Sequence, residues 1–188
     1  MKKLTILTLV TVLTYSLVAF KPAPEKWVSS KTHVKFFSTT AAEDIEANNY
    51  KTVSTIDPNS GEVVFSVPMQ SFEFEKSLMQ KHFNQDDFLD TKNYPKAKFT
   101  GNITNLGDIN WEADGTYSAT ITGDLTIRGV TKSYTEKGSI TVSGNTLKAN
   151  SIFNVKLADH AIAFEKGKPS TNVVKTVEIT LISEYQPQ

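Results

Sequence analysis

The sequence contains no cysteine among its 188 residues and a single arginine, Arg128. The lack of cysteine excludes a disulfide scaffold, thiolate catalysis and every cysteine-ligated metal or iron–sulfur site. Lysine and arginine together number 20, and so do aspartate and glutamate, which leaves a formal net charge of zero at pH 7. A balanced charge lacks the basic footprint typical of nucleic-acid-binding proteins, so we expect no nucleic-acid partner.

Motifs that form catalytic sites are also missing from the sequence. It has no Gly-x-Ser-x-Gly elbow, no Walker loop and no Gly-x-Gly-x-x-Gly. Its histidines, His33, His82 and His160, lie far apart along the chain, whereas a zinc site needs three or four converging ligands. We therefore expect no enzyme activity, no metal and no cofactor. A catalytic triad assembled only in three dimensions stays open as the alternative.

Long hydrophobic runs are confined to the beginning of the chain. Two lysines, Lys2 and Lys3, precede residues 4–20, which carry no charge, and a proline-containing stretch follows. This order is typical of an export signal. The alternative is a membrane anchor, although 17 residues lie at the lower edge of the roughly 17–25 that cross a bilayer. The sequence predicts a signal peptide at 1–20, a linker at 21–26, a periplasmic or secreted location and no stable membrane span after signal removal.

From Trp27 onward, hydrophobic and polar residues alternate with a period of two, which is the pattern of half-buried strands. The longest run extends from Tyr117 to Ile127, and similar runs begin near Val63, Ala97 and Leu147. The pattern predicts about eight short antiparallel strands. By itself it favours a barrel and a sandwich equally.

One stretch, Phe72–Tyr94, departs from this alternation. Leu78, Met79, His82 and Phe83 fall at helical spacing, which predicts a short helix near Ser77–Phe83. We expect Ser71 or Ser77 to cap it and a turn to follow at Asp86–Asp90.

Turn-forming residues separate the predicted strands. Asp57–Gly61 has the composition of a strong turn, Asp114–Gly115 that of a tight hairpin, and Ser143–Asn145 that of another. The final turn is expected within Gly167–Ser170. Several positions on the predicted inner face are small, which either lets sheets pack closely or leaves room for a ligand: Ala97, Gly101, Ala119, Gly123 and Ala149.

Two blocks of the sequence resemble the YceI-like family. The first, residues 82–99, has a histidine in the predicted helix, then Asp-Phe-Leu-Asp, then Tyr-Pro-Lys-Ala-Lys-Phe opening a strand. The second, residues 123–132, reads Gly-Asp-Leu-Thr-Ile-Arg-Gly-Val-Thr-Lys. Two long blocks in the family's order are far more specific than one short motif. The resemblance extends over nearly all of the predicted domain, residues 27–185.

The resemblance implies an all-β fold, an extended eight-stranded antiparallel lipocalin-like barrel with one short helical insertion. It also implies an exported, non-enzymatic protein that sequesters or carries a hydrophobic small molecule, a polyisoprenoid or similar lipid, in the barrel interior. A homodimer is a further implication, for which the sequence itself carries no signal. The alternative is a filled barrel that acts as a structural or protein-interaction module in the cell envelope.

Each candidate site residue has both a functional and a structural interpretation. For the channel residues, the alternative to contact with a ligand is an ordinary core position. His82 and Arg128 are candidates for the polar mouth of the channel; the alternatives are a helix-terminal hydrogen bond and an exposed turn charge. The candidate channel-lining residues are Phe36, Phe65, Val67, Met69, Phe83, Phe88, Phe99, Ile121, Leu125 and Phe153.

Two segments depart from the family pattern. Asp159–Lys166 is shorter than the strand pair of isoprenoid-binding members, and Ala41–Tyr50 lacks the usual Gly-x-Phe. Both segments are expected where a channel is lined or closed. They leave the barrel in place and leave open the identity and length of the ligand.

Overall fold

The structure is a computed structural model that describes residues 26–39, 44–162, 164–165, 168–169 and 175–188. The predicted signal peptide and all of the predicted linker except Lys26 lie outside these residues. Most of the described chain is strand, with one α-helix, α1 (Ser77–Asn84). The strands are β1 (Trp27–Thr39), β2 (Asp44–Asn49), β3 (Val53–Ile56), β4 (Glu62–Pro68), β5 (Phe72–Phe74), β6 (Lys96–Ile103), β7 (Gly115–Ile127), β8 (Val130–Ser143), β9 (Thr146–Lys156), β10 (Phe164–Glu165), β11 (Lys168–Pro169) and β12 (Thr176–Pro187).

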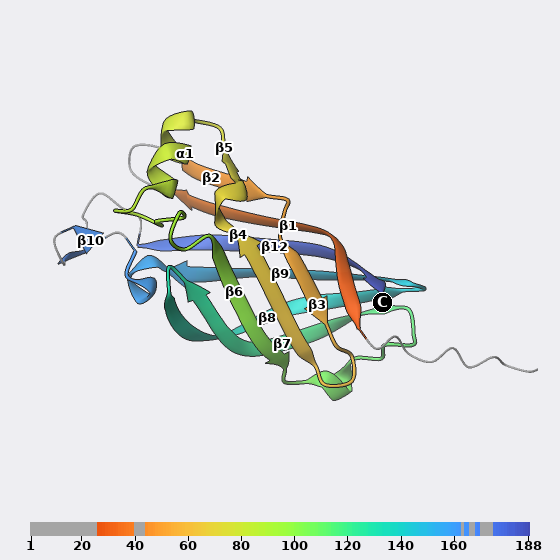
Figure 1. Ribbon diagram of the computed structural model, residues 1–188. Helices are drawn as coiled ribbons and strands as arrows, with labels where there is room; N and C mark the ends of the chain where they lie inside the picture. Colours follow the sequence, from red (N-terminus) through yellow and green to blue (C-terminus); the bar gives the residue numbers. More distant parts are fainter. Residues whose placement is uncertain (1–25, 40–43, 163, 166–167, 170–174) are drawn as a thin grey trace, which may run out of the picture.

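The sheet closes on itself into an antiparallel barrel (Figure 1). Its strands follow the order β12-β9-β8-β7-β6-β4-β3-β1, and β1 then pairs with β12, from Trp27 opposite Pro187 to Phe37 opposite Glu178. Closure gives each of these eight strands two neighbours, although β8 and β9 pair only over Gly138–Ser143 and Thr146–Ser151. The predicted eight-stranded barrel is therefore confirmed, and the sandwich is excluded.

Two barrel strands, β3 and β4, each have a short strand next to them in the chain, β2 before β3 and β5 after β4. β1 pairs with β3 at Trp27–Val28 and with β2 at Val34–Thr39. A 3-10 helix, η1 (Met69–Ser71), separates β4 from β5, and β5 pairs with β2. β2 and β5 thus extend the barrel sheet at the end where α1 lies, opposite the end where β1 begins (Figure 1).

The predicted helix is confirmed almost residue for residue, as α1. Its capping prediction is wrong, because Ser77 is the first helical residue and the N-cap position is Lys76. The interruption predicted from Phe72 is also too long, since Phe72–Phe74 forms β5. The alternation Phe-Glu-Phe was the local signal for that strand.

Two predicted turns are confirmed. The Asp57 side chain accepts hydrogen bonds from the backbone N–H groups of Asn59 (2.8 Å) and Ser60 (3.2 Å). The β8–β9 hairpin turns through Gly144, which has a positive φ of 55°.

The predicted tight hairpin at Asp114–Gly115 is wrong. An eleven-residue connection that contains the 3-10 helix η2 (Leu106–Asp108) joins β6 to β7. The Asp114 carboxylate instead accepts a hydrogen bond from the N–H of Gly144, at 2.7 Å. The predicted final turn at Gly167–Ser170 lies largely outside the described residues.

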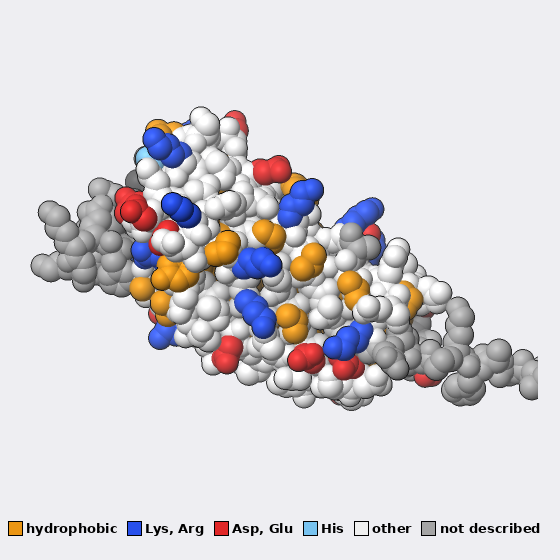
Figure 2. Space-filling model, viewed as in Figure 1, with side chains coloured by type: hydrophobic (Ala, Val, Ile, Leu, Met, Phe, Trp, Pro, Cys, Tyr) orange, Lys and Arg blue, Asp and Glu red, His pale blue; other side chains and the backbone are white. Residues whose placement is uncertain are grey.

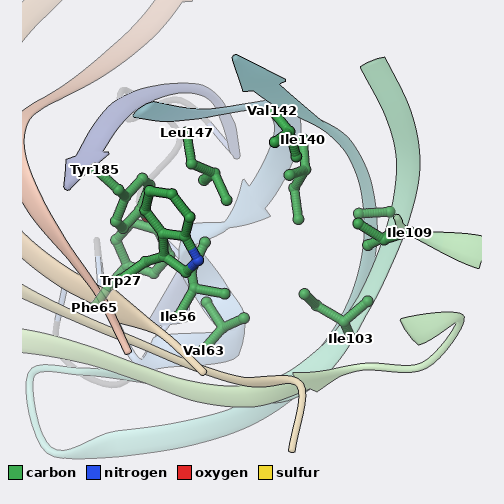
Figure 3. Packing of buried hydrophobic residues seen from close by; sticks show 11 residues of the cluster. Trp27, Ile56, Val63, Phe65, Ile103, Ile109, Ile140, Val142, Leu147 and Tyr185 are labelled. Atoms are coloured by element: carbon green, nitrogen blue, oxygen red, sulfur yellow. The ribbon is translucent and has the colours of Figure 1, made fainter. Parts of the chain in front are cut away.

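The end of the barrel that holds the start of β1 and the end of β12 has a cluster of buried hydrophobic residues. Figure 3 shows Trp27, Ile56, Leu147 and Tyr185 pointing toward one another there. Tyr185 is fully buried, and its hydroxyl accepts a hydrogen bond from the Ser54 hydroxyl at 2.8 Å. A buried tyrosine needs such a partner, so this end of the barrel is fixed by both packing and hydrogen bonding.

The outer wall has a different character. Figure 2 shows acidic, basic and apolar side chains interspersed over the face of β3, β4 and β6. This mixture agrees with the balanced net charge of the sequence.

Gly101 and Gly123 face each other on β6 and β7, where the two backbones approach closely. A Cβ on Gly123 would lie 2.7 Å from Cζ of Phe99 and 2.5 Å from the carbonyl oxygen of Thr100. The glycine pair therefore makes room for the Phe99 ring inside the barrel.

Gly123→Ala should destabilise the protein by about 1–3 kcal/mol, the usual range for overpacking, because backbone and the Phe99 ring must both move. Gly107→Ala is the matched control, since a Cβ there would meet nothing within 4 Å. Urea unfolding of both variants measures the difference. Equal unfolding free energies for the two variants would contradict the close approach.

Candidate ligand-binding channel

A cavity of about 470 Å³ occupies the interior of the barrel. At the packed end it reaches Ile56 and Ile103, and at the other end it reaches Met79 and Phe83 of α1. The alternating inward side chains of the barrel strands form its wall, which is predominantly apolar. Its size lies within the roughly 300–1,000 Å³ of small-molecule sites. The interior is therefore hollow, and a filled barrel is not what the sequence folds into.

All ten residues predicted to line a channel lie on the wall of this cavity. Contact with a ligand stays a prediction for each of them. The ten are Phe36, Phe65, Val67, Met69, Phe83, Phe88, Phe99, Ile121, Leu125 and Phe153.

The small residues divide into two groups. Ala97, Ala119 and Ala149 line the cavity, so they leave space in the interior. Gly101 and Gly123 instead permit close packing of neighbouring strands. Both interpretations of small inward residues therefore hold, at different positions.

A cluster of phenylalanines joins α1 to the barrel wall. The ring of Phe83 is centred 5.7 Å from Phe36, 5.5 Å from Phe72, 5.0 Å from Phe74 and 6.4 Å from Phe88. These separations are typical of favourable aromatic pairs. Phe83 thus fixes α1 over the end of the cavity, where Met79 and His82 join the lining.

Sequence reasoning missed several lining residues at this end. Phe72 and Phe74 line the cavity from β5, within the stretch that the sequence analysis treats as interrupted, although their own alternation indicates a strand. Met79 shares the helical face of Phe83 and could have been found from that spacing. Ile45 and Ile162, from the two segments that depart from the family pattern, also line the cavity.

The two predicted polar residues of the mouth have different surroundings. His82 is exposed in the last turn of α1 and does line the cavity. Arg128 does not belong to the lining; its guanidinium donates to the carbonyl oxygens of Asp86 (2.8 Å) and Ala161 (3.0 Å). Arg128 therefore ties the segment after α1 to the segment after β9, with a positive φ of 49° in the β7–β8 turn.

A buried histidine lies beside the cavity, on the 3-10 helix η3 (Leu157–His160). The Nδ1 of His160 lies 3.0 Å from the carbonyl oxygen of Val130, and its Nε2 lies 3.0 Å from the Tyr134 hydroxyl. A carbonyl only accepts, so Nδ1 carries the hydrogen and Nε2 of the neutral ring accepts from Tyr134. Burial lowers the pKa of His160 below its ordinary value of 6.5, which agrees with a neutral ring.

One carboxylate, Glu136, lines the cavity. It forms no hydrogen bond or ion pair with another described residue, and burial raises its pKa above the ordinary value of a glutamate. Burial likewise raises the pKa of Tyr134, and the charges of Asp159 and Glu136 raise it further. Neither Tyr134 nor Glu136 was singled out from the sequence.

The described part of the chain holds no cluster of three or more histidine, aspartate or glutamate side chains placed to bind a metal ion. Its histidines lie in separate surroundings. His33 packs on Tyr50 and pairs with Asn48, while His160 is buried near Tyr134. No helix within the described ranges is long and apolar enough to cross a membrane.

A closed antiparallel barrel around an apolar cavity defines a lipocalin-like class of fold. The family model of the YceI-like domain matches residues 23–184. The chain therefore belongs to the YceI-like family, as its two sequence blocks predicted.

Curated relatives match part of the chain. It is 32% identical to a UPF0312 protein of Pseudomonas putida over 87 residues, 46% of this chain and 42% of the relative. It is 30% identical to a UPF0312 protein of Shewanella denitrificans over 121 residues, 61% of this chain and 60% of that one. The matches thus span between about two fifths and three fifths of the relatives' length.

Solved structures share the fold at low sequence identity. A polyisoprenoid-binding domain from Saccharophagus degradans superposes with a TM-score of 0.72 at 14% identity, over 88% of this chain and 99% of that domain. BcnA of Burkholderia cenocepacia gives 0.66 at 19% identity, over 81% and 95%. The YceI protein of Campylobacter jejuni gives 0.56 at 18% identity, over 100% and 99%. These likenesses establish the barrel fold.

The depressed pKa of His160 predicts a loss of stability in acid. Because the unfolded chain binds a proton more readily, the free energy of unfolding falls as the pH drops through 6.5, the ordinary histidine pKa, toward the lower folded value. Urea unfolding at a series of pH values from neutral to mildly acidic measures this slope. His160→Gln should reduce the slope, while His82→Gln, at an exposed position, should retain it. Equal slopes in the two variants would contradict the assignment.

Proposed function

We propose that this chain is an exported, non-enzymatic binding protein that sequesters or carries a hydrophobic small molecule in the interior of its barrel. The observation that carries the proposal is the apolar cavity, which extends from Ile56 to the phenylalanine cluster around Phe83. A cavity of this kind holds an alkyl or isoprenoid chain without any catalytic group.

Burial of apolar surface is large enough to supply the binding energy. A ligand tail of C₄₀ class removes several hundred Å² from water, and at about 25 cal/mol per Å² the gross gain is of order 10 kcal/mol. The loss of translational freedom and the ordering of the tail reduce this gain.

A polyisoprenoid is the ligand class that we favour. The Saccharophagus degradans neighbour is a polyisoprenoid-binding domain, and its fold matches this one over nearly its full length. Export is supported by the charged start and apolar run of residues 1–20. Assembly into a homodimer stays a prediction that the family resemblance supplies.

The direct test is extraction of the natively purified chain, expressed from Ala23, with organic solvent and identification of released molecules by mass spectrometry. We expect one isoprenoid or related lipid per barrel. A barrel that is empty, and stays empty after exposure to a lipid extract of the source cells, would refute the carrier function for this chain.

Ile121→Lys should abolish retention of the ligand, because Ile121 lines the cavity and a buried ammonium there strongly disfavours an apolar occupant. Thr122→Lys is the matched control, since the adjacent side chain is exposed on the outer face of β7. Circular dichroism verifies that both variants fold. Ligand retention by folded Ile121→Lys at the wild-type level would place the ligand elsewhere.

A further inference from the structure

Strands β8 and β9 are paired along only part of their length. Their register runs from Gly138 opposite Ser151 to Ser143 opposite Thr146. Beyond Gly138, residues 130–137 of β8 remain paired with β7, and residues 152–156 of β9 remain paired with β12. The barrel wall therefore opens between these two pairs of strands, and Figure 1 shows β7 and β8 curving away from β9.

The opening has a defined boundary at both ends. Where the strands part, the Ser151 hydroxyl donates to the carbonyl oxygen of Lys137 at 2.8 Å. At the far end, η3 contacts β8 through His160. The His160 ring forms hydrogen bonds with the Tyr134 hydroxyl and the carbonyl oxygen of Val130. The rings of Tyr134 and His160 stack with centroids 5.9 Å apart. These contacts hold the opening in shape.

The interior cavity borders this opening. Tyr134 and Glu136, from the inward-facing positions of β8, line the cavity. So do Ser139 and Asn150, a directly opposed pair from the outward-facing positions of β8 and β9. The part of the cavity wall beside the opening is therefore polar, in contrast to its largely apolar remainder.

The polar groups at the opening offer hydrogen-bond acceptors to a ligand. The Tyr134 hydroxyl hydrogen is directed to Nε2 of His160, and the Ser151 hydroxyl hydrogen to the carbonyl oxygen of Lys137. Their oxygens keep lone pairs. The Glu136 carboxylate, which only accepts when ionised, has no partner among the described residues.

Glu136 is the one carboxylate among the described residues that line the cavity, and no lysine or arginine among them lines it. The charge of Asp159 on η3 raises the pKa of Tyr134 and of His160. The charge of Lys132, on the same face of β8 as Glu136, lowers the pKa of His160. Lys132 and Asp159 are both exposed and offset each other. Lys137 and Lys156 also border the opening, but both are exposed and neither lines the cavity, so Glu136 is the charge that faces the interior.

We propose that the opening between β8 and β9 holds the polar end of the bound molecule, and that this end is a hydrogen-bond donor without negative charge, an alcohol or an ammonium. This inference rests on the proposed function, because it requires the apolar tail to occupy the cavity. It places the head group at the side of the barrel instead of beside His82 at the helical end.

The test compares three probes with one C₂₀ isoprenoid tail and different heads: geranylgeraniol, geranylgeranylamine and geranylgeranyl phosphate. Dissociation constants are measured for the wild-type chain by displacement of a fluorescent fatty alcohol. We expect the amine and the alcohol to bind at least about tenfold more tightly than the phosphate, since only donors satisfy the acceptors at the opening.

Glu136→Gln should weaken binding of the amine by about tenfold and change binding of the alcohol by less than about threefold, because the substitution removes the charge and keeps the shape. Glu178→Gln, on the outer face of β12, is the control and should bind all three probes as the wild type does.

Three results would overturn the inference and leave the proposed function standing, two of them from the wild-type chain. One is equal binding of the three probes by the wild-type chain, and the other is tightest binding of the phosphate. Loss of amine preference in Glu178→Gln to the same extent as in Glu136→Gln would also overturn it. A wild-type chain that binds none of the three probes would instead refute the proposed function itself.

Discussion

Pairing of β1 with β12 is the interaction on which the rest of the structure depends. These strands are the first and last of the barrel, and their register joins Trp27–Phe37 to Glu178–Pro187. Closure gives every strand of the ring two neighbours, so the inner face is shielded from water along most of its length. An apolar cavity can persist only in such an enclosure, because an open sheet would expose or collapse it.

The two ends of the barrel are closed by different means. At the end that holds the start of β1 and the end of β12, Trp27, Leu147 and Tyr185 pack together, and none of the three lines the cavity. At the other end, a helix covers the interior and is fixed by one buried side chain, Phe83, among the surrounding phenylalanine rings. The cavity lies between these ends. Its third boundary, between β8 and β9, is incomplete, and there polar groups meet the apolar interior.

Much of the fold could be predicted from local sequence, because alternation and turn chemistry act over a few residues. The strand from Gly115 to Ile127, the helix at Ser77–Asn84 and the inward direction of Phe99 and Ile121 all follow from such patterns. The predicted hairpin at Asp114–Gly115 is wrong because the conformation there depends on a contact with a distant residue. Asp114 bonds to Gly144, thirty residues away, and local turn propensity contains nothing about that partner.

The polar part of the site could not be predicted for a related reason. Residues 130–137 of β8 are mostly polar on both faces, so alternation does not show that Tyr134 and Glu136 point inward. The parting of β8 from β9 depends on which strand each half pairs with, and pairing partners are not encoded in a single strand. Arg128 was identified as notable, yet its two carbonyl partners are distant in sequence and were not foreseen.

The central claim is that the interior of the barrel, and not its outer surface, holds the hydrophobic chain. The most direct measurement is a crystal structure of the chain with an isoprenoid alcohol brominated along its tail, located by anomalous scattering of bromine. We expect bromine peaks inside the barrel, between Phe65, Phe99 and Ile121, which line the cavity. Peaks confined to the outer face, with an interior free of ligand density, would contradict it.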